Sequence, residues 1–432
     1  MMDPLTVTFA IAAPIAKGLA SGIYERYGGV IRDTATKQVV TWLREYAPGS
    51  VKENLPTPSD PSSFINLVVS GVNTTATGAN VAITSKGFSD VNQHLGGIEQ
   101  QISGLQHVIQ HAQGILQVTS AASILNLGIS VMGFAVISKQ LRELEDRLQQ
   151  AQELLIKVDR KIDLGFYANF RAALDMAMNA FTMSKPENRE RSAMAAINRF
   201  LEAEHIYADY TDQELKLDSQ IADEYLLTLS LAYITEARCY LELEEPETAL
   251  RRFQEGSKVI RSRIKQYVDL LLTSNPAVYL QPQFKETIDL RRLTKIYQWI
   301  DPNLDESAVF ELQRENLFSL GRTFNPASSA WVKSLPPAIL SRVEVQGGWF
   351  GPSEEELKKE ADKRLPQILE VIESMVETNR RFESYQSEIE AIAQLGMSFQ
   401  EWLQLKPSEA QPQGAELMYI TPSEPLEFVS LH

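Results

Sequence analysis

Two histidines at a spacing that suits a metal ion are the first residues that could do chemistry. His107 and His111 stand four positions apart, so on a helix both imidazole rings would lie on one face and could chelate a divalent cation. The residues between them supply no glutamate that could act as the general base of a metallopeptidase helix. We therefore expect two polar histidines on a helix surface and no metal site.

Other common catalytic signatures are missing from the sequence. It contains no glycine-rich dinucleotide motif, no phosphate-binding loop and no Gly-x-Ser-x-Gly motif for a nucleophilic serine, so the backbone devices of these mechanisms are absent. Acidic pairs such as Glu143 and Glu145 lie on charged helical faces, which is typical of solvated surface. Cys239 is the only cysteine and allows neither an intramolecular disulfide nor a cysteine-based metal cage. We expect no enzymatic activity and no cofactor.

The length of the chain indicates its number of domains, and its charge indicates which classes of partner it can bind. The 432 residues suffice for two or three domains. The net charge is −15 and the pI is near 5.0, whereas binding to phosphates needs clustered lysines and arginines. We therefore expect no nucleic-acid partner. The apolar run Pro4–Ala16 has no basic region before it, so we expect no signal peptide and a cytoplasmic protein.

Helical periodicity accounts for most of the chain, and we expect an all-α fold of long antiparallel helices followed by helical hairpins. Near the N-terminus, Ile11, Ile15 and Leu19 recur every four positions, and Ser353 with Glu356 forms a capping box at the start of a long helix. The expected organisation is a helical unit at 1–50, a linker at 51–64, long heptad helices at 65–165, a helical-hairpin region at 166–272, an irregular connector at 273–352, a C-terminal long helix at 353–403 and a flexible tail at 404–432.

An uncharged stretch, Gln100–Ser138, begins in a first heptad seam, and two such seams flank its most apolar part, Gly114–Ser138. This part has 25 residues, and about 20 span a bilayer core, so its length permits a transmembrane helix. Interspersed polar residues make it only moderately hydrophobic, however, and burial in a helical bundle explains the lack of charge equally well. A third interpretation is a bundle that stores the segment and releases it into a membrane. The residues that would then enter lipid are Ile115, Leu116, Val118, Ile124, Leu125, Leu127, Ile129, Val131, Met132, Phe134, Val136 and Ile137.

The order of heptad helix, apolar piece and heptad helix over Val91–Asp163 resembles the α-helical pore-forming proteins of the cytolysin A and haemolysin BL families. The resemblance is architectural and includes no diagnostic motif. It implies that Ile115–Ile137 enters lipid and that the chain forms a homo-oligomer through its heptad seams. The expected absence of a signal peptide departs from those secreted toxins, and it implies another route of delivery or action on the producer's own membrane.

A second local pattern, at 231–260, resembles one tetratricopeptide hairpin. Small and aromatic residues occupy the positions at which two antiparallel helices of such a repeat approach each other. They are Tyr233, Ala237, Tyr240, Ala249, Phe253 and Gly256. An array needs three or more repeats, so we expect a single hairpin. Upstream, we expect Met176, Met178, Phe181 and Met183 to form helical core.

These patterns lead to two hypotheses about function. The preferred one is a conditional membrane-interacting, pore-forming protein that oligomerises and has membrane lipid as its partner. The alternative is a soluble helical adaptor that binds a protein partner through its tetratricopeptide-like region.

Overall fold

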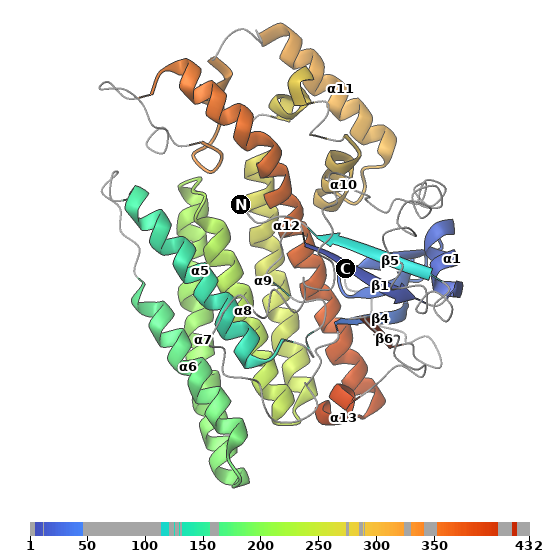
Figure 1. Cartoon of the computed structure of the whole chain (residues 1–432), viewed down its shortest axis with the longest axis vertical. Helices are drawn as coiled ribbons and strands as arrows, with labels where there is room; N and C mark the ends of the chain where they lie inside the picture. Colours follow the sequence, from blue (N-terminus) through green and yellow to red (C-terminus); the bar gives the residue numbers. More distant parts are fainter. Residues whose placement is uncertain are drawn as a thin grey trace, which may run out of the picture. The chain divides into compact units, whose positions relative to one another are not determined.

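A computed structural model of the chain describes residues 5–11, 13–45, 114–120, 125, 129, 132–155, 164–273, 276–284, 288, 290–323, 330–340, 352–404 and 417–420. Helices dominate these residues (Figure 1). The described residues include ten α-helices and six short strands. The prediction of a mostly all-α protein is confirmed. The chain divides into two compact units. Unit 1 comprises Met1–Ser120, Leu125–Met132 and Arg380–His432, and unit 2 comprises Ala121–Ile124 and Gly133–Asn379.

Unit 2 is built around one enclosed helix, α8. Its α-helices are α5 (Phe134–Leu155), α6 (Gly165–Thr182), α7 (Pro186–Lys216), α8 (Ala222–Glu242), α9 (Pro246–Thr273), α10 (Leu290–Ile300), α11 (Glu306–Thr323) and the first part of α12 (Glu354–Leu395). Of the 21 residues of α8, 17 are buried, and the helix contacts α5, α7 and α9. Buried residues therefore lie on all sides of α8, which is typical of a helix enclosed by others.

Hydroxyl groups on α8 are satisfied within the helix itself. The side chains of Thr228, Ser230 and Thr235 donate to the carbonyl oxygens four residues earlier, at 2.7, 2.9 and 2.5 Å. Such local bonds let polar residues stay in an apolar interior, and Thr228 also contacts the Tyr167 hydroxyl of α6 at 2.5 Å. At its far end, α8 turns into α9 through Glu244, which has a φ of 58°, and Pro246 occupies the first position of α9, where a proline fits well.

The stretch expected as an irregular connector at 273–352 contains two α-helices, α10 and α11, and the short 3-10 helices Pro276–Leu280, Pro282–Phe284 and Ala330–Ser334. The prediction of an irregular connector is therefore wrong for these residues. In α10, Leu293, Ile296 and Tyr297 form a buried stripe at helical spacing, and burial of that stripe outweighs the helix-breaking effect of the nearby prolines.

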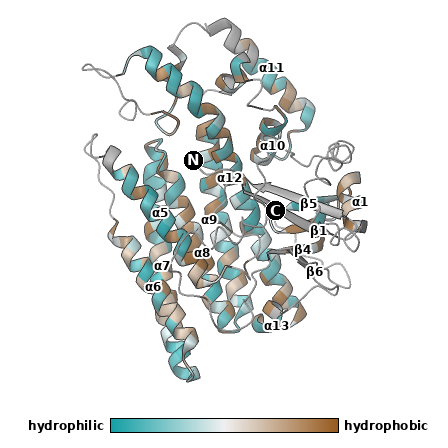
Figure 2. Cartoon of the chain, in the orientation of Figure 1, coloured by the Kyte–Doolittle hydropathy of each residue, from teal (hydrophilic) through white to brown (hydrophobic). Residues whose placement is uncertain are grey.

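The residues predicted to form a long C-terminal helix lie in α12 and in α13 (Phe399–Gln404). The capping box begins α12: the Ser353 N–H donates to the Glu356 carboxylate at 2.7 Å, and the Glu356 N–H donates to the Ser353 Oγ at 3.2 Å. Hydrophilic and hydrophobic residues are interspersed along α12 (Figure 2). After α12, Gly396 takes a φ of 59°, and the chain turns into α13.

Unit 1 contains the strands, which contradicts the helical unit expected at 1–50. Besides α1 (Ala13–Ser21), its elements are the strands β1 (Leu5–Ile11), β2 (Tyr24–Tyr27), β3 (Val30–Asp33), β4 (Val39–Glu45), β5 (Gly114–Ser120) and β6 (Leu417–Ile420). One antiparallel sheet has the order β2-β3-β4-β6, and β1 pairs with β5. The β-branched residues of β3 and β4 favour strands, and the Gly28-Gly29 turn lets β2 pair with β3, so only α1 keeps the expected helix.

Some of the segments expected from the sequence lie outside the described residues, and one, the C-terminal tail, is described only in part. The linker at 51–64, the first heptad seam up to Gln113, and His107 with His111 lie outside the described residues. The tail expected to be flexible contributes β6, which pairs with β4 through Ile420 and Trp42. A four-residue apolar run gains a strand only when a paired edge is available, so the tail sequence alone did not predict it.

Candidate functional site

The uncharged segment is not one helix. Gly114–Ser120 forms β5, which runs antiparallel to β1 with Leu5 opposite Ser120 and Ile11 opposite Gly114. Ile115, Leu116 and Val118 therefore lie in a strand, which corrects the expected helix. Pairing with a distant apolar strand outweighs the local helical pattern here, because strand pairing is decided by the partner as much as by propensity.

The other residues that we expected to enter lipid differ in their burial. Ile124, Leu127 and Val131 lie outside the described residues. Val136 is half-buried on α5. The others are buried, with exposed fractions of 9% or less: Leu125, Ile129, Met132, Phe134 and Ile137. Burial in the protein thus accounts for the absence of charge at these five positions.

Two charged side chains of α12 hold the backbone of this segment within unit 1. The Arg381 guanidinium donates to the carbonyl oxygen of Leu125, and the Ile129 N–H donates to Glu388 Oε2 at 2.7 Å. Glu388 Oε1 also accepts a bond from the indole N–H of Trp402 at 2.8 Å. We call Arg381, Glu388 and Trp402 the clamp.

The three side chains of the clamp are buried and closely packed. Arg381 is 6% exposed, Glu388 4% and Trp402 1%, and the Trp402 ring meets Trp42 of β4 edge to face at 5.5 Å. Leu125 lies in a bend and Ile129 in 3-10 conformation. The Ile129 carbonyl accepts from the Met132 N–H at 3.1 Å, whereas the Ile129 N–H and the Leu125 carbonyl bind side chains of α12. Charge-assisted hydrogen bonds to backbone groups are stronger than neutral ones. The clamp therefore binds two backbone groups of the uncharged segment through one cationic and one anionic side chain.

The tetratricopeptide-like residues meet at the interface of α8 and α9. Ala237, Ala249 and Phe253 are fully buried, Tyr240 is half-buried, and Gly256 lies so close to Tyr233 that a Cβ there would be 2.4 Å from the ring. The tyrosine therefore packs on bare backbone, as the hairpin pattern implies. Since α8 is enclosed, a partner of this hairpin would have to contact the outer face of α9.

A buried carboxyl pair next to this interface escaped the sequence reasoning. Arg252 of α9 contacts Glu204 of α7 and Glu236 of α8, each at 2.9 Å, and the two carboxyl side chains are only 4% and 0% exposed. Burial, followed by the charge of Glu236 and its hydrogen bond, raises the pKa of Glu204 to about 10 despite Arg252. Glu204 therefore keeps its proton at neutral pH. A glutamate within the apolar α8 sequence was the signal that could have revealed the pair.

We expect the pH dependence of stability to report on Glu204. The folded protein keeps this proton up to about pH 10, whereas the carboxyl ionises near its ordinary value of 4.5 when unfolded. Stability should therefore fall as pH rises between these values, by at most about 1.4 kcal/mol per unit. Glu204→Gln removes the ionisable carboxyl group. The free energy of unfolding of this variant, measured in urea at pH 6 and pH 9, should therefore depend less on pH than that of wild type. Glu255→Gln, at a 52% exposed contact of the same arginine, is the control, and equal slopes for E204Q and wild type would contradict the assignment.

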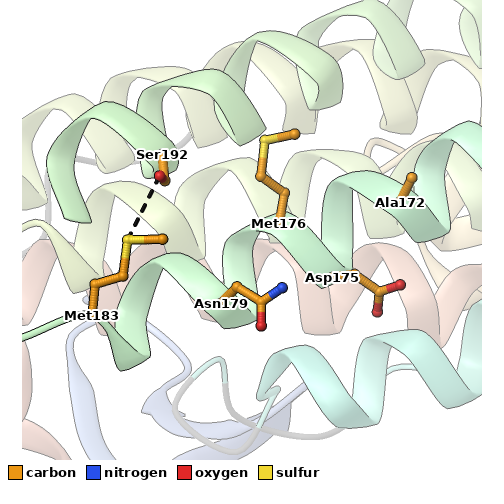
Figure 3. Close-up of a pocket in the computed structure, with 6 residues that line it drawn as sticks. All are labelled: Ala172, Asp175, Met176, Asn179, Met183 and Ser192. Atoms are coloured by element: carbon orange, nitrogen blue, oxygen red, sulfur yellow. Dashed lines mark hydrogen bonds between the residues drawn. The ribbon is translucent and has the colours of Figure 1, made fainter. Parts of the chain in front are cut away.

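An open hollow lies on the surface of α6 and α7 (Figure 3). Its volume is about 420 Å³, and the residues around it are Ala172, Asp175, Met176, Asn179, Met183 and Ser192. Met176 is 37% exposed, and the Ser192 hydroxyl donates to the Met183 sulfur at 3.7 Å. The expected methionine core is thus wrong for Met176, while Phe181 does pack, stacked on Phe134 at 5.6 Å.

Three further features were sought among the described residues: a metal-ion cluster, a reactive thiol and a membrane-spanning helix. No cluster of His, Cys, Asp and Glu suitable for a metal ion occurs among the described residues. Cys239 is buried, and burial raises the pKa of its thiol well above the usual value, which disfavours a reactive thiolate. None of the described helices combines the length and apolarity that crossing a bilayer requires.

No protein-family model, no curated protein and no solved structure matches this chain.

Proposed function

We propose that this chain is a conditional membrane-interacting helical protein that stores its uncharged segment in the fold and releases it to lipid. The observation that carries the proposal is the clamp. The described residues Leu125 and Ile129 are apolar and buried, yet their backbone groups are bound by an arginine and a glutamate. A core helix would satisfy these groups itself.

The energetics of the clamp suit reversible storage. Each charge-assisted hydrogen bond contributes about 1.5–3 kcal/mol, an amount that a competing interaction can replace. A released segment could satisfy its backbone by forming a helix in lipid, where helices are one of the few structures that leave no polar group unpaired. The 25 uncharged residues of Gly114–Ser138 exceed the roughly 20 that a spanning helix needs. The architectural resemblance to α-helical pore-forming proteins agrees with this proposal.

Assembly of several copies completes the proposal, because a single helix cannot enclose a pore. In the stored form, the α5 seam is not free for this purpose: Ile137, Leu141, Leu144 and Leu148 are fully buried, and α5 packs on α6 and α8. Oligomerisation through the seam would therefore follow release of α5 and not precede it.

The test weakens the clamp without changing the segment. Glu388→Gln keeps the size of the side chain but removes the charge that binds Ile129 and Trp402. Vesicles of phosphatidylcholine and phosphatidylglycerol are mixed with wild type and variant, and flotation and dye release are measured. We expect roughly tenfold more vesicle binding for E388Q, because losing about 1.4 kcal/mol of storage shifts the equilibrium tenfold. A protease-protected fragment containing Ile115–Ile137 should appear only with lipid.

The matched control is Glu370→Gln, since Glu370 lies on the same helix with an exposed side chain. It should bind vesicles like wild type. If E388Q exchanges its Ile129 amide faster than wild type but still neither floats with vesicles nor releases dye, the proposal of a membrane function is wrong.

A second candidate function, a protein-binding adaptor, is favoured by the hollow on α6 and α7. Exposed methionines such as Met176 and Met194, which are 37% and 43% exposed, adapt their shape to apolar side chains of a partner. Asp175, which also lines the hollow, would pair with a basic residue of that partner. A stable protein complex that Met176→Glu abolishes and E388Q leaves intact would favour the adaptor over the membrane function.

A further inference from the structure

Three consecutive residues at the turn between β2 and β3 contact α12 beside the clamp, and we infer that this turn regulates release of the stored segment by holding Arg381 and Glu388 in place. The inference rests on the proposed function and names its regulator. We call Tyr27, Gly28 and Gly29 the control turn.

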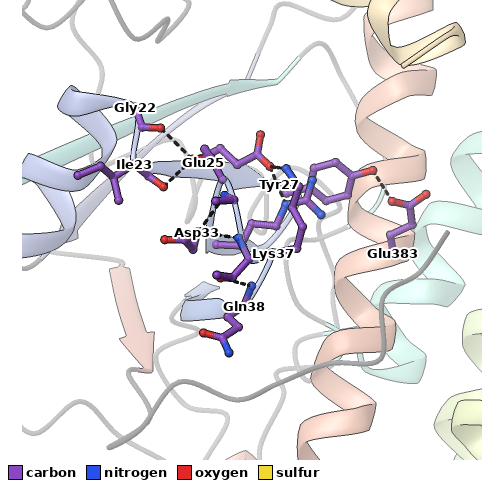
Figure 4. Close-up of polar contacts among 12 residues, drawn as sticks. Gly22, Ile23, Glu25, Tyr27, Asp33, Lys37, Gln38 and Glu383 are labelled. Atoms are coloured by element: carbon purple, nitrogen blue, oxygen red, sulfur yellow. Dashed lines mark hydrogen bonds and ion pairs between the residues drawn. The ribbon is translucent and has the colours of Figure 1, made fainter. Parts of the chain in front are cut away.

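Each residue of the control turn makes a different contact with α12. The Tyr27 hydroxyl donates to the Glu383 carboxylate (Figure 4), and the Gly29 N–H donates to the Ser384 hydroxyl at 3.0 Å. Between them, Gly28 has a φ of 56°, and a Cβ on it would lie 2.4 Å from the Arg380 carbonyl oxygen. Backbone therefore lies directly against backbone, which only glycine permits at this distance.

These contacts lead directly to the clamp. Ser384 accepts from Gly29 and donates to the carbonyl oxygen of Arg381 at 2.8 Å, so one hydroxyl joins the control turn to the residue that binds Leu125. Glu388 lies one helical turn beyond Ser384, on the same side of α12. Displacement of the control turn would thus free the α12 segment that carries both charged groups of the clamp.

The rest of the sheet holds the control turn firmly. The Leu43 N–H of β4 donates to the Gly29 carbonyl at 2.7 Å, and the Arg32 guanidinium lies over the Tyr27 ring at 3.7 Å. Burial and the neighbouring Glu383 raise the pKa of Tyr27 well above its usual value. The hydroxyl therefore remains a donor across physiological pH, so the regulating event is displacement of the control turn and not ionisation of this tyrosine.

The experiment compares two glycine substitutions of the intact chain. Gly28→Ala introduces a Cβ that cannot fit against Arg380, whereas Gly396→Ala has a nearly identical φ of 59° and no atom within 4 Å of the new Cβ. Both variants bear the strain of a left-handed alanine, and only the first displaces the control turn. Amide hydrogen exchange at Ile129 is measured without lipid. We expect exchange about tenfold faster for G28A and within about twofold of wild type for G396A.

A milder variant covers the case in which G28A does not fold. Tyr27→Phe removes only the hydroxyl bound to Glu383, and we expect exchange at Ile129 to accelerate about threefold to tenfold. Equal acceleration by G28A and G396A would mean general destabilisation and overturn the inference, as would unchanged exchange in Y27F.

The two proposals fail in different ways. Faster exchange in G28A without vesicle binding by G28A or E388Q supports the control turn and overturns the membrane function. Vesicle binding by E388Q with unchanged Ile129 exchange in G28A and Y27F supports the membrane function and overturns the control turn.

Discussion

Replacing Arg252 with methionine is expected to lower the free energy of unfolding by about 3–5 kcal/mol at pH 8. Methionine keeps the apolar stem of the side chain, but it removes the guanidinium that lies 2.9 Å from both Glu204 and Glu236. Glu204 is protonated at this pH because its pKa is about 10. Glu236, with an exposed fraction of 0%, would then be a buried carboxylate without a cation. Urea unfolding followed by far-ultraviolet circular dichroism measures the loss.

A second substitution separates charge from packing. In Arg252→Met with Glu236→Gln, the cluster carries no charge, so we expect most of the lost stability to return. If the double variant is no more stable than R252M, the loss comes from packing of the Arg252 stem, and the electrostatic explanation is wrong.

Truncating Trp402 to alanine is expected to destabilise unit 1 by about 3–5 kcal/mol. The side chain is 1% exposed, packs edge to face on Trp42 at 5.5 Å and donates to Glu388 at 2.8 Å. Alanine leaves a cavity and removes a donor from a buried carboxylate. Amide exchange at Ile31 and Leu43, which are 0% and 1% exposed, measures the change in unit 1 itself.

Two controls divide this loss. Trp402→Phe keeps most of the apolar volume and loses the indole N–H, so it should cost about 1–3 kcal/mol. Phe310→Ala, at a residue of α11 that is 64% exposed, should change stability by no more than about 0.5 kcal/mol. Equal effects of W402A and F310A on exchange at Ile31 would show that α13 contributes nothing to this unit.

The helical hairpin and the long helix were predictable because their signals are local. Tyr233 and Gly256 follow a spacing that brings a ring onto bare backbone, and they meet in the structure. Ser353 and Glu356 lie close enough in sequence to form a capping box without help from distant residues. In both cases the residues that decide the structure lie within about one or two helical turns of each other, or in one hairpin.

The strands were missed because their partners are distant. Residues 114–120 look like part of an apolar helix until β1, more than a hundred positions earlier, supplies a paired edge. The same holds for β6, which pairs with β4. Strand formation depends on such pairing, so a helical spacing within one segment cannot exclude it.

The same distinction between local and distant signals holds for the candidate site. The sequence by itself determined that Gln100–Ser138 contains no Lys, Arg, Asp or Glu, that Cys239 has no cysteine to pair with, and that most of the chain forms amphipathic helices. Only the tertiary structure decided that Arg381 and Glu388 bind the backbone of the uncharged segment, and that Glu204 and Glu236 share one arginine. The physical reason is that a buried charge is stable only beside a partner, and sequence position does not reveal a partner some 250 residues away.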